Sequence, residues 1–68
     1  MVKLMCPPKR ENNGKFTIVA FADSVLDVTS EMTIEGLSSD AKLSYSSVIV
    51  TADADVAFLK SDGTWNWI

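Results

Sequence analysis

The chain has 68 residues, a formal net charge of −3 at pH 7, one cysteine and no histidine. This length suits one domain and lies near the lower limit at which a single hydrophobic core stabilises a fold. A lone cysteine excludes an internal disulfide, and a thiol without imidazoles excludes the usual Cys/His zinc site. We therefore expect either a marginally stable monomer or stabilisation by self-association.

Charge divides the chain into two parts. Residues 1–15 hold four basic residues and one acidic residue, a balance of +3, whereas residues 16–68 hold two basic and eight acidic residues, a balance of −6. An acidic body repels phosphate, so we expect no nucleic-acid binding by it. The first part contains Pro7-Pro8 and has no apolar periodicity. We therefore predict that residues 1–15 form a flexible basic leader, which is mobile up to about residue 13. Residues 16–68 are then expected to form one domain.

Membrane and export signals are not predicted. No run of 18 apolar residues occurs, and residues 1–5 lack the apolar core of a secretory signal. The absence of disulfides suits a reducing compartment. We therefore expect no membrane partner.

The first predicted strand covers residues 16–22. This segment is apolar on both alternating faces and rich in β-branched and aromatic side chains, which indicates a buried central strand. Ser24 and Asp27 have the spacing of a weak capping box, so at most one short helical turn is expected near residues 24–29. Residues 32–35 alternate in polarity, and a brief strand is an open possibility there.

The last third of the chain predicts hairpins. Three segments rich in β-formers are separated by turn residues, and they cover 43–51, 56–60 and 64–68. Asp62-Gly63 is the stronger turn signal because glycine accepts a positive φ. The expected fold is mainly β, a small antiparallel sheet or meander of about four strands with at most one short helix.

No catalytic or metal site is predicted. The commonest general base is missing without histidine, and no lysine of the body stands beside a recognisable nucleophile motif. Asp53 and Asp55 alternate in a predicted turn, but calcium loops supply more oxygen ligands in a defined order. Three widely spaced glycines form no phosphate loop. We expect a protein that is not an enzyme and has no cofactor.

Trp65 and Trp67 are the most informative aromatic residues, because they share one face of the last predicted strand. Such a pair can close a core, form a subunit contact or stack on sugar rings. Because such a small domain has little core, we expect closing the core to be the default role of the tryptophan pair. Together with Tyr45 and Phe58, the tryptophans are the predicted interface or core residues.

From residue 21 to 68 the order of features resembles small bacteriophage and prophage structural proteins, such as head-fibre, decoration or neck-adjacent modules. The matching features are a strand running into 22–28, a strand at 47–51, its partner at 55–59 and an Asp-Gly hairpin at 61–65. The leader with Cys6-Pro7-Pro8 departs from this pattern, as does the connection at 29–32, which lacks a proline. The resemblance implies no catalytic residues.

These features predict a virion structural or assembly module that acts through protein–protein contacts. The expected partners are other virion proteins or further copies of the chain, and the expected location is the virion or the bacterial cytoplasm. Two alternatives remain open. One is a small acidic phage or mobile-element inhibitor of a host nucleic-acid-handling enzyme, which would present carboxylates where phosphates would lie. The other is a carbohydrate-binding module that uses Trp65 and Trp67.

Overall fold

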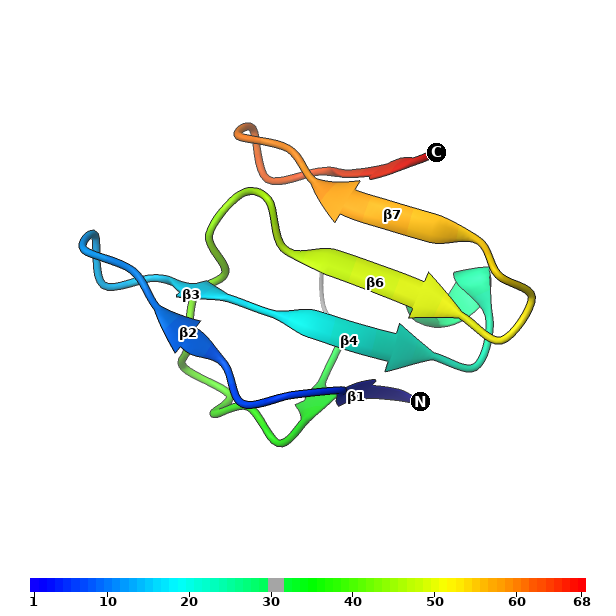
Figure 1. Cartoon of the computed structure of the whole chain (residues 1–68), viewed down its shortest axis with the longest axis horizontal. Coiled ribbons are helices and arrows are strands. Elements are labelled where there is room, and N and C mark those ends of the chain that lie inside the picture. The colour runs from blue at the N-terminus through cyan, green and yellow to red at the C-terminus, as the bar shows by residue number, and fades with distance from the viewer. Residues whose placement is uncertain (30–31) are drawn as a thin grey trace.

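The computed structural model describes residues 1–29 and 32–68, and the fold is mainly β (Figure 1). Six strands form a mixed sheet in the order β5-β1-β4-β6-β7-β8, and two form a separate ladder, β2-β3. The strands are β1 (Val2–Leu4), β2 (Lys9–Arg10), β3 (Phe16–Thr17), β4 (Val19–Ala22), β5 (Ile34–Glu35), β6 (Val48–Thr51), β7 (Val56–Leu59) and β8 (Trp65–Trp67). A 3-10 turn, η1 (Val25–Asp27), follows β4.

The predicted C-terminal hairpins are present. Strands β6, β7 and β8 are consecutive antiparallel neighbours in the sheet. In the β6–β7 turn, the Asp55 amide donates to the Thr51 hydroxyl at 3.1 Å, and Ala54 has a φ of 68°. Gly63 has a φ of 91° in the β7–β8 turn, the conformation expected of the Asp-Gly signal. Local turn chemistry therefore accounts for this half of the sheet.

The rest of the sheet differs from the predicted four-stranded antiparallel meander, which is wrong in strand number and in topology. Strand β4 pairs in parallel with β6 and antiparallel with β1, and β1 pairs in parallel with β5. A parallel pair needs a long connection that leaves one end of the sheet and returns to the other. Residues 23–47 form that connection, and they contain η1 and the brief strand β5.

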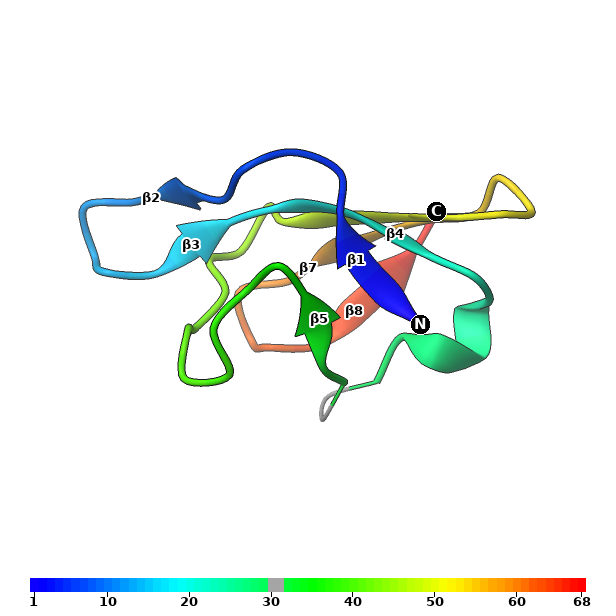
Figure 2. The same ribbon diagram turned by 90° about the horizontal axis from the view of Figure 1, so that it is seen from below.

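The N-terminal segment, which was predicted to be a flexible leader, is part of the folded domain in the structure. Strand β1 lies between β4 and β5 within the sheet, and its Val2 is only 2% exposed and belongs to the core (Figure 2). Residues 9–17 then form the β2-β3 hairpin, in which Arg10 pairs with Phe16. The fold therefore does not divide at residue 15, because burial of Val2 and Leu4 on the core side integrates the first strand.

The core lies on one side of the six-stranded sheet. It is formed by Val2, Ile18, Ala20, Ala22, Ile34 and Ile49, with Leu4, Phe16, Val28, Met32, Leu37, Leu43 and Trp65 packed against it. In Figure 2 the connection that carries η1 and β5 lies on this same side. Among the described residues, the largest fully buried side chains are Ile18 and Ile49, followed by the small side chain of Ser47.

Ser47 shows how the polar part of this core is satisfied. Its hydroxyl donates to the Ser44 carbonyl at 2.8 Å and accepts from the Ile18 amide at 3.2 Å. The side chain thereby joins the start of β6 to the start of β4. Across residues 1–29 and 32–68, no buried side-chain nitrogen or oxygen lacks a hydrogen-bond partner, so the small core has no polar defect.

Candidate functional site

The two faces of the sheet differ in side-chain size. Paired residues in neighbouring strands point to the same side, so the register assigns each residue to a face. The inner face of the three central strands carries Ala20, Ala22, Ile49, Thr51, Ala57 and Leu59. The opposite side, here called the outer face, carries Val19, Phe21, Val48, Val50, Val56 and Phe58. The larger apolar side chains thus lie mostly on the side away from the core.

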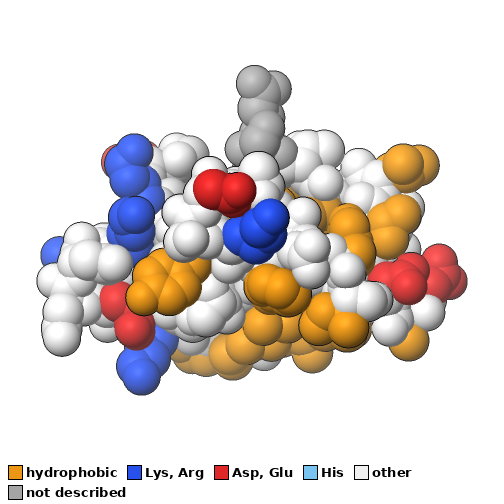
Figure 3. Space-filling view, turned by 90° about the horizontal axis from the view of Figure 1, so that it is seen from above, with side chains coloured by type: hydrophobic (Ala, Val, Ile, Leu, Met, Phe, Trp, Pro, Cys, Tyr) orange, Lys and Arg blue, Asp and Glu red, His pale blue; other side chains and the backbone are white. Residues whose placement is uncertain are grey.

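The outer face is accessible to solvent. Val19 is 39% exposed, and the other five side chains of the outer face are half-buried. Figure 3 shows hydrophobic side chains gathered along the lower side of the molecule in that view. Figure 2 shows that η1 and the edge strands β5 and β8 curl away from the outer face, toward the other side of the central strands. Neighbouring side chains of the sheet supply the partial burial, because they stand next to one another on the pleated surface.

The margin of the outer face is polar and electrically balanced. Lys3 on β1 is opposite Glu35 on β5, and Asn66 on β8 is opposite Phe58. Among the described residues of the six strands, the charged side chains on this face are this one cation and this one anion. An apolar centre with a polar margin is the usual anatomy of a protein–protein contact surface.

The predicted site residues do not converge. Phe58 belongs to the outer face, whereas Trp65 and Trp67 are opposite Leu59 and Ala57 and so lie on the inner face. Trp65 is half-buried against the core, and Trp67 is 37% exposed. Tyr45 lies apart from all three, in the turn before β6, and is 62% exposed. The four residues therefore form no single site.

Sequence reasoning did not single out five residues of the outer face, Val19, Phe21, Val48, Val50 and Val56. Part of the signal was present, because residues 18–22 are apolar at every position and therefore on both faces of a strand. That pattern predicted burial on both sides. In the structure, the described residues cover the inner side of the central strands and leave the outer side exposed.

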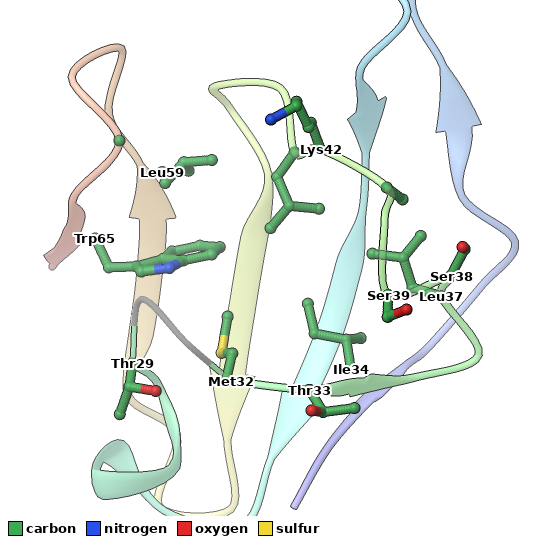
Figure 4. A pocket seen from close by; sticks show the side chains of 13 residues that line it. Thr29, Met32, Thr33, Ile34, Leu37, Ser38, Ser39, Lys42, Leu59 and Trp65 are labelled. Atoms are coloured by element: carbon green, nitrogen blue, oxygen red, sulfur yellow. The ribbon is translucent and has the colours of Figure 1, made fainter.

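A pocket of about 490 Å³ lies on the inner side, between the β7–β8 hairpin and the connection. Figure 4 shows the Trp65 indole on one wall, with Met32 facing it and Ile34 further along. Lys42 and the hydroxyls of Thr33, Ser38 and Ser39 also line the pocket. One wall, at Thr29 and Met32, adjoins residues 30–31, which lie outside the described part of the chain, so we assign the pocket no ligand.

The titratable groups with clearly shifted pKa values lie away from the outer face. Hydrogen bonding to Asp27 at 2.6 Å raises the pKa of the Met1 ammonium, with a further contribution from Asp23 at 3.3 Å. The Thr64 hydroxyl, 2.7 Å from the Asp62 carboxylate, lowers the pKa of that carboxyl group. Both groups are at the surface, and each shift arises from local pairing.

Residues 1–29 and 32–68 contain no recognisable metal cluster and no membrane-spanning helix. In these ranges, no group of three or more His, Cys, Asp or Glu side chains is placed to hold a metal ion, and Cys6 is exposed as a free thiol. No helix in the same ranges has the length and apolar character needed to cross a membrane.

Comparisons with protein families, with curated proteins and with solved structures give no match to this chain. The fold and the surface therefore define the protein as a mainly β domain. One apolar face of its sheet is covered and the other is exposed to solvent.

Proposed function

We propose that this chain is a non-catalytic interaction module that binds protein through the outer face, and that its assembly is a bacteriophage or prophage virion. The observation that carries the proposal is the outer face itself, six contiguous valine and phenylalanine side chains on strands β4, β6 and β7. The assignment to a virion is supported by the sequence resemblance over residues 21–68.

The energetics of the outer face favour a partner. Apolar surface gains about 25 cal/mol for every Å² removed from water. Soluble proteins rarely leave contiguous apolar patches of more than a few hundred Å² uncovered, and larger ones usually mark interaction sites. Val and Phe side chains on three adjacent strands form one contiguous, partly exposed apolar patch. A protein partner would gain free energy by covering the part that remains exposed.

Carbohydrate binding is less well supported. A sugar platform needs aromatic rings that face solvent side by side. Trp65 instead packs against the core, which leaves Trp67 as the more exposed of the two rings. The inner face thus uses one tryptophan for closure, and the outer face remains the better candidate for binding.

A photo-cross-linking experiment tests the proposal. The variant Phe58→p-benzoylphenylalanine places a reactive aromatic group on the outer face, and Tyr45→p-benzoylphenylalanine places the same group at an exposed turn away from it. Both variants are irradiated in the bacterium that produces the protein. We expect defined adducts from position 58 and few or diffuse adducts from position 45.

Mass spectrometry of the adducts then identifies the partner. Adducts with virion proteins or with the chain itself would support the proposal. Identical adducts from both positions, or none from position 58, would refute the proposed role of the outer face. Defined adducts with proteins unrelated to a virion would refute the virion assignment alone.

A further inference from the structure

We infer that the partner of the outer face is a second copy of this chain, so that two sheets pack face to face in a symmetric dimer. This inference rests on the proposed role of the outer face and specifies its partner. In such a dimer the same patch is used by both copies, as a two-fold axis requires.

Side-chain size is the first argument. Two sheets that pack face to face lie about 10 Å apart, and side chains from both must fill that space. The inner face has alanine at positions 20, 22 and 57, which suits an irregular connection lying against it. The outer face instead has Phe21, Phe58 and four valines, which are large enough to interdigitate with a second sheet. The partner best matched to this face is therefore another sheet of the same kind.

The available area is the second argument. The three strands of the outer face, about 4.8 Å apart with up to four residues at about 3.3 Å each, give roughly 190 Å² in projection, and the margin strands β1 and β8 raise this to roughly 300 Å². Protruding side chains increase the accessible area further, so two copies would bury on the order of 600–900 Å² in total, below the size of a standard specific interface. The expected dimer is therefore weak, with a Kd of about 10–300 µM.

Charge is the third argument. The chain carries a net charge of −3, but the outer face holds Lys3 and Glu35 in balance. Two copies can therefore meet on this face without like-charge repulsion, which would oppose contact through the acidic turns. A nucleic acid would require a cationic face, and the balance here does not provide one.

Sedimentation equilibrium of the intact chain is the central test. The monomer mass is 7.4 kDa. We expect the weight-average mass to rise from this value toward twice it as the concentration increases from about 5 µM to about 1 mM, in line with the expected Kd. A monomer mass across the whole range would overturn the inference.

Matched valine-to-lysine variants locate the contact. Val50→Lys introduces a charge at the centre of the outer face, whereas Val25→Lys changes an exposed valine of η1, on the opposite side of the sheet. We expect Val50→Lys to weaken dimerisation at least about 30-fold, because it would bury an unpaired charge. Val25→Lys should dimerise like the unmodified chain. Equal effects of the two variants, or none from Val50→Lys, would overturn the inference.

Folding is checked independently. Far-ultraviolet circular dichroism and thermal melts at about 5 µM, below the expected Kd, compare each variant with the unmodified monomer. Val50→Thr, which keeps the branched shape and removes apolar character, provides a second outer-face variant if Val50→Lys fails to fold. It should weaken the dimer in the same direction and by a smaller factor.

The same proteins separate this inference from the proposed function. A monomeric chain whose position-58 adducts contain a virion protein of a different sequence would overturn the dimer and leave the interaction module standing. Binding to vesicles of phosphatidylglycerol and phosphatidylcholine that is lost in Val50→Lys would assign the face to a lipid surface and overturn both. A dimer that persists in both outer-face variants would place the contact elsewhere and overturn the inference.

Discussion

The inner and outer faces of strands β4, β6 and β7 are both apolar, yet only one is covered. The inner face carries Ala20, Ala57 and Ile49, each 0% exposed, beneath the connection and Trp65. The outer face carries Val and Phe side chains that no described segment covers. The comparison teaches that this sheet is suited to burial on both sides, whereas residues 1–29 and 32–68 of this short chain cover only one of them.

The largest expected effect tests whether stability resides on the inner face. Ile49→Ala removes one of the few large, fully buried side chains, and such changes cost about 2–5 kcal/mol. The adjacent outer-face change Val50→Thr should cost less than about 1 kcal/mol in the monomer. Urea denaturation followed by circular dichroism at low protein concentration measures both. Equal losses would mean that the two faces contribute equally to monomer stability.

The second prediction separates the tryptophans. Trp65 packs against the core and Trp67 is 37% exposed, so Trp65→Ala should destabilise the monomer by about 2–4 kcal/mol and Trp67→Ala by about 1 kcal/mol. Thermal melts measure the difference. Neither residue lies on the outer face, so Trp67→Ala should also leave the sedimentation behaviour unchanged. Loss of the dimer in that variant would shift the contact to the inner face and β8.

The smallest expected effect concerns the β7–β8 turn, which returns Trp65 to the inner face. Hydrogen bonding from Thr64 lowers the Asp62 pKa below its ordinary value of 3.8, so the stabilisation is present above pH 3.8 and is lost as pH falls through the lower, folded-state pKa. Thr64→Val should raise the pKa toward 3.8, and Thr64→Ser should retain the lowered value. Carboxyl-carbon NMR titration measures it. An unchanged pKa in Thr64→Val would assign the shift to the Thr64 backbone amide.

Local signals predicted several elements. The hairpins of the last third followed from β-rich segments separated by turn residues, and Ser24 capped the short helical turn by accepting from the Leu26 amide at 3.1 Å. The brief strand that the alternating polarity of residues 32–35 allows is present as β5, at Ile34–Glu35. Each of these features depends on neighbours within a few residues, which is the range that sequence patterns report.

The N-terminal part was not predicted, because its structure depends on distant partners. Strand β1 has three residues, and its alternation of Val2 and Leu4 is short beside the cations and prolines that follow. Its pairing with β4 and β5 brings residue 2 next to residues 22 and 34. A segment this short acquires its strand conformation from the sheet that receives it.

For the candidate site, too, one part follows from the sequence and another part from the tertiary structure. The sequence by itself determined that residues 18–22 are apolar on both sides of a strand, and it identified Phe58 as an interface or core residue. Only the tertiary structure decided which side is covered. A strand has a period of two, so a segment apolar on both faces has no local preference for either one. The described parts of the connection, residues 23–29 and 32–47, lie on the side of Ala20 and Ala22, which leaves Val19 and Phe21 on the outer face.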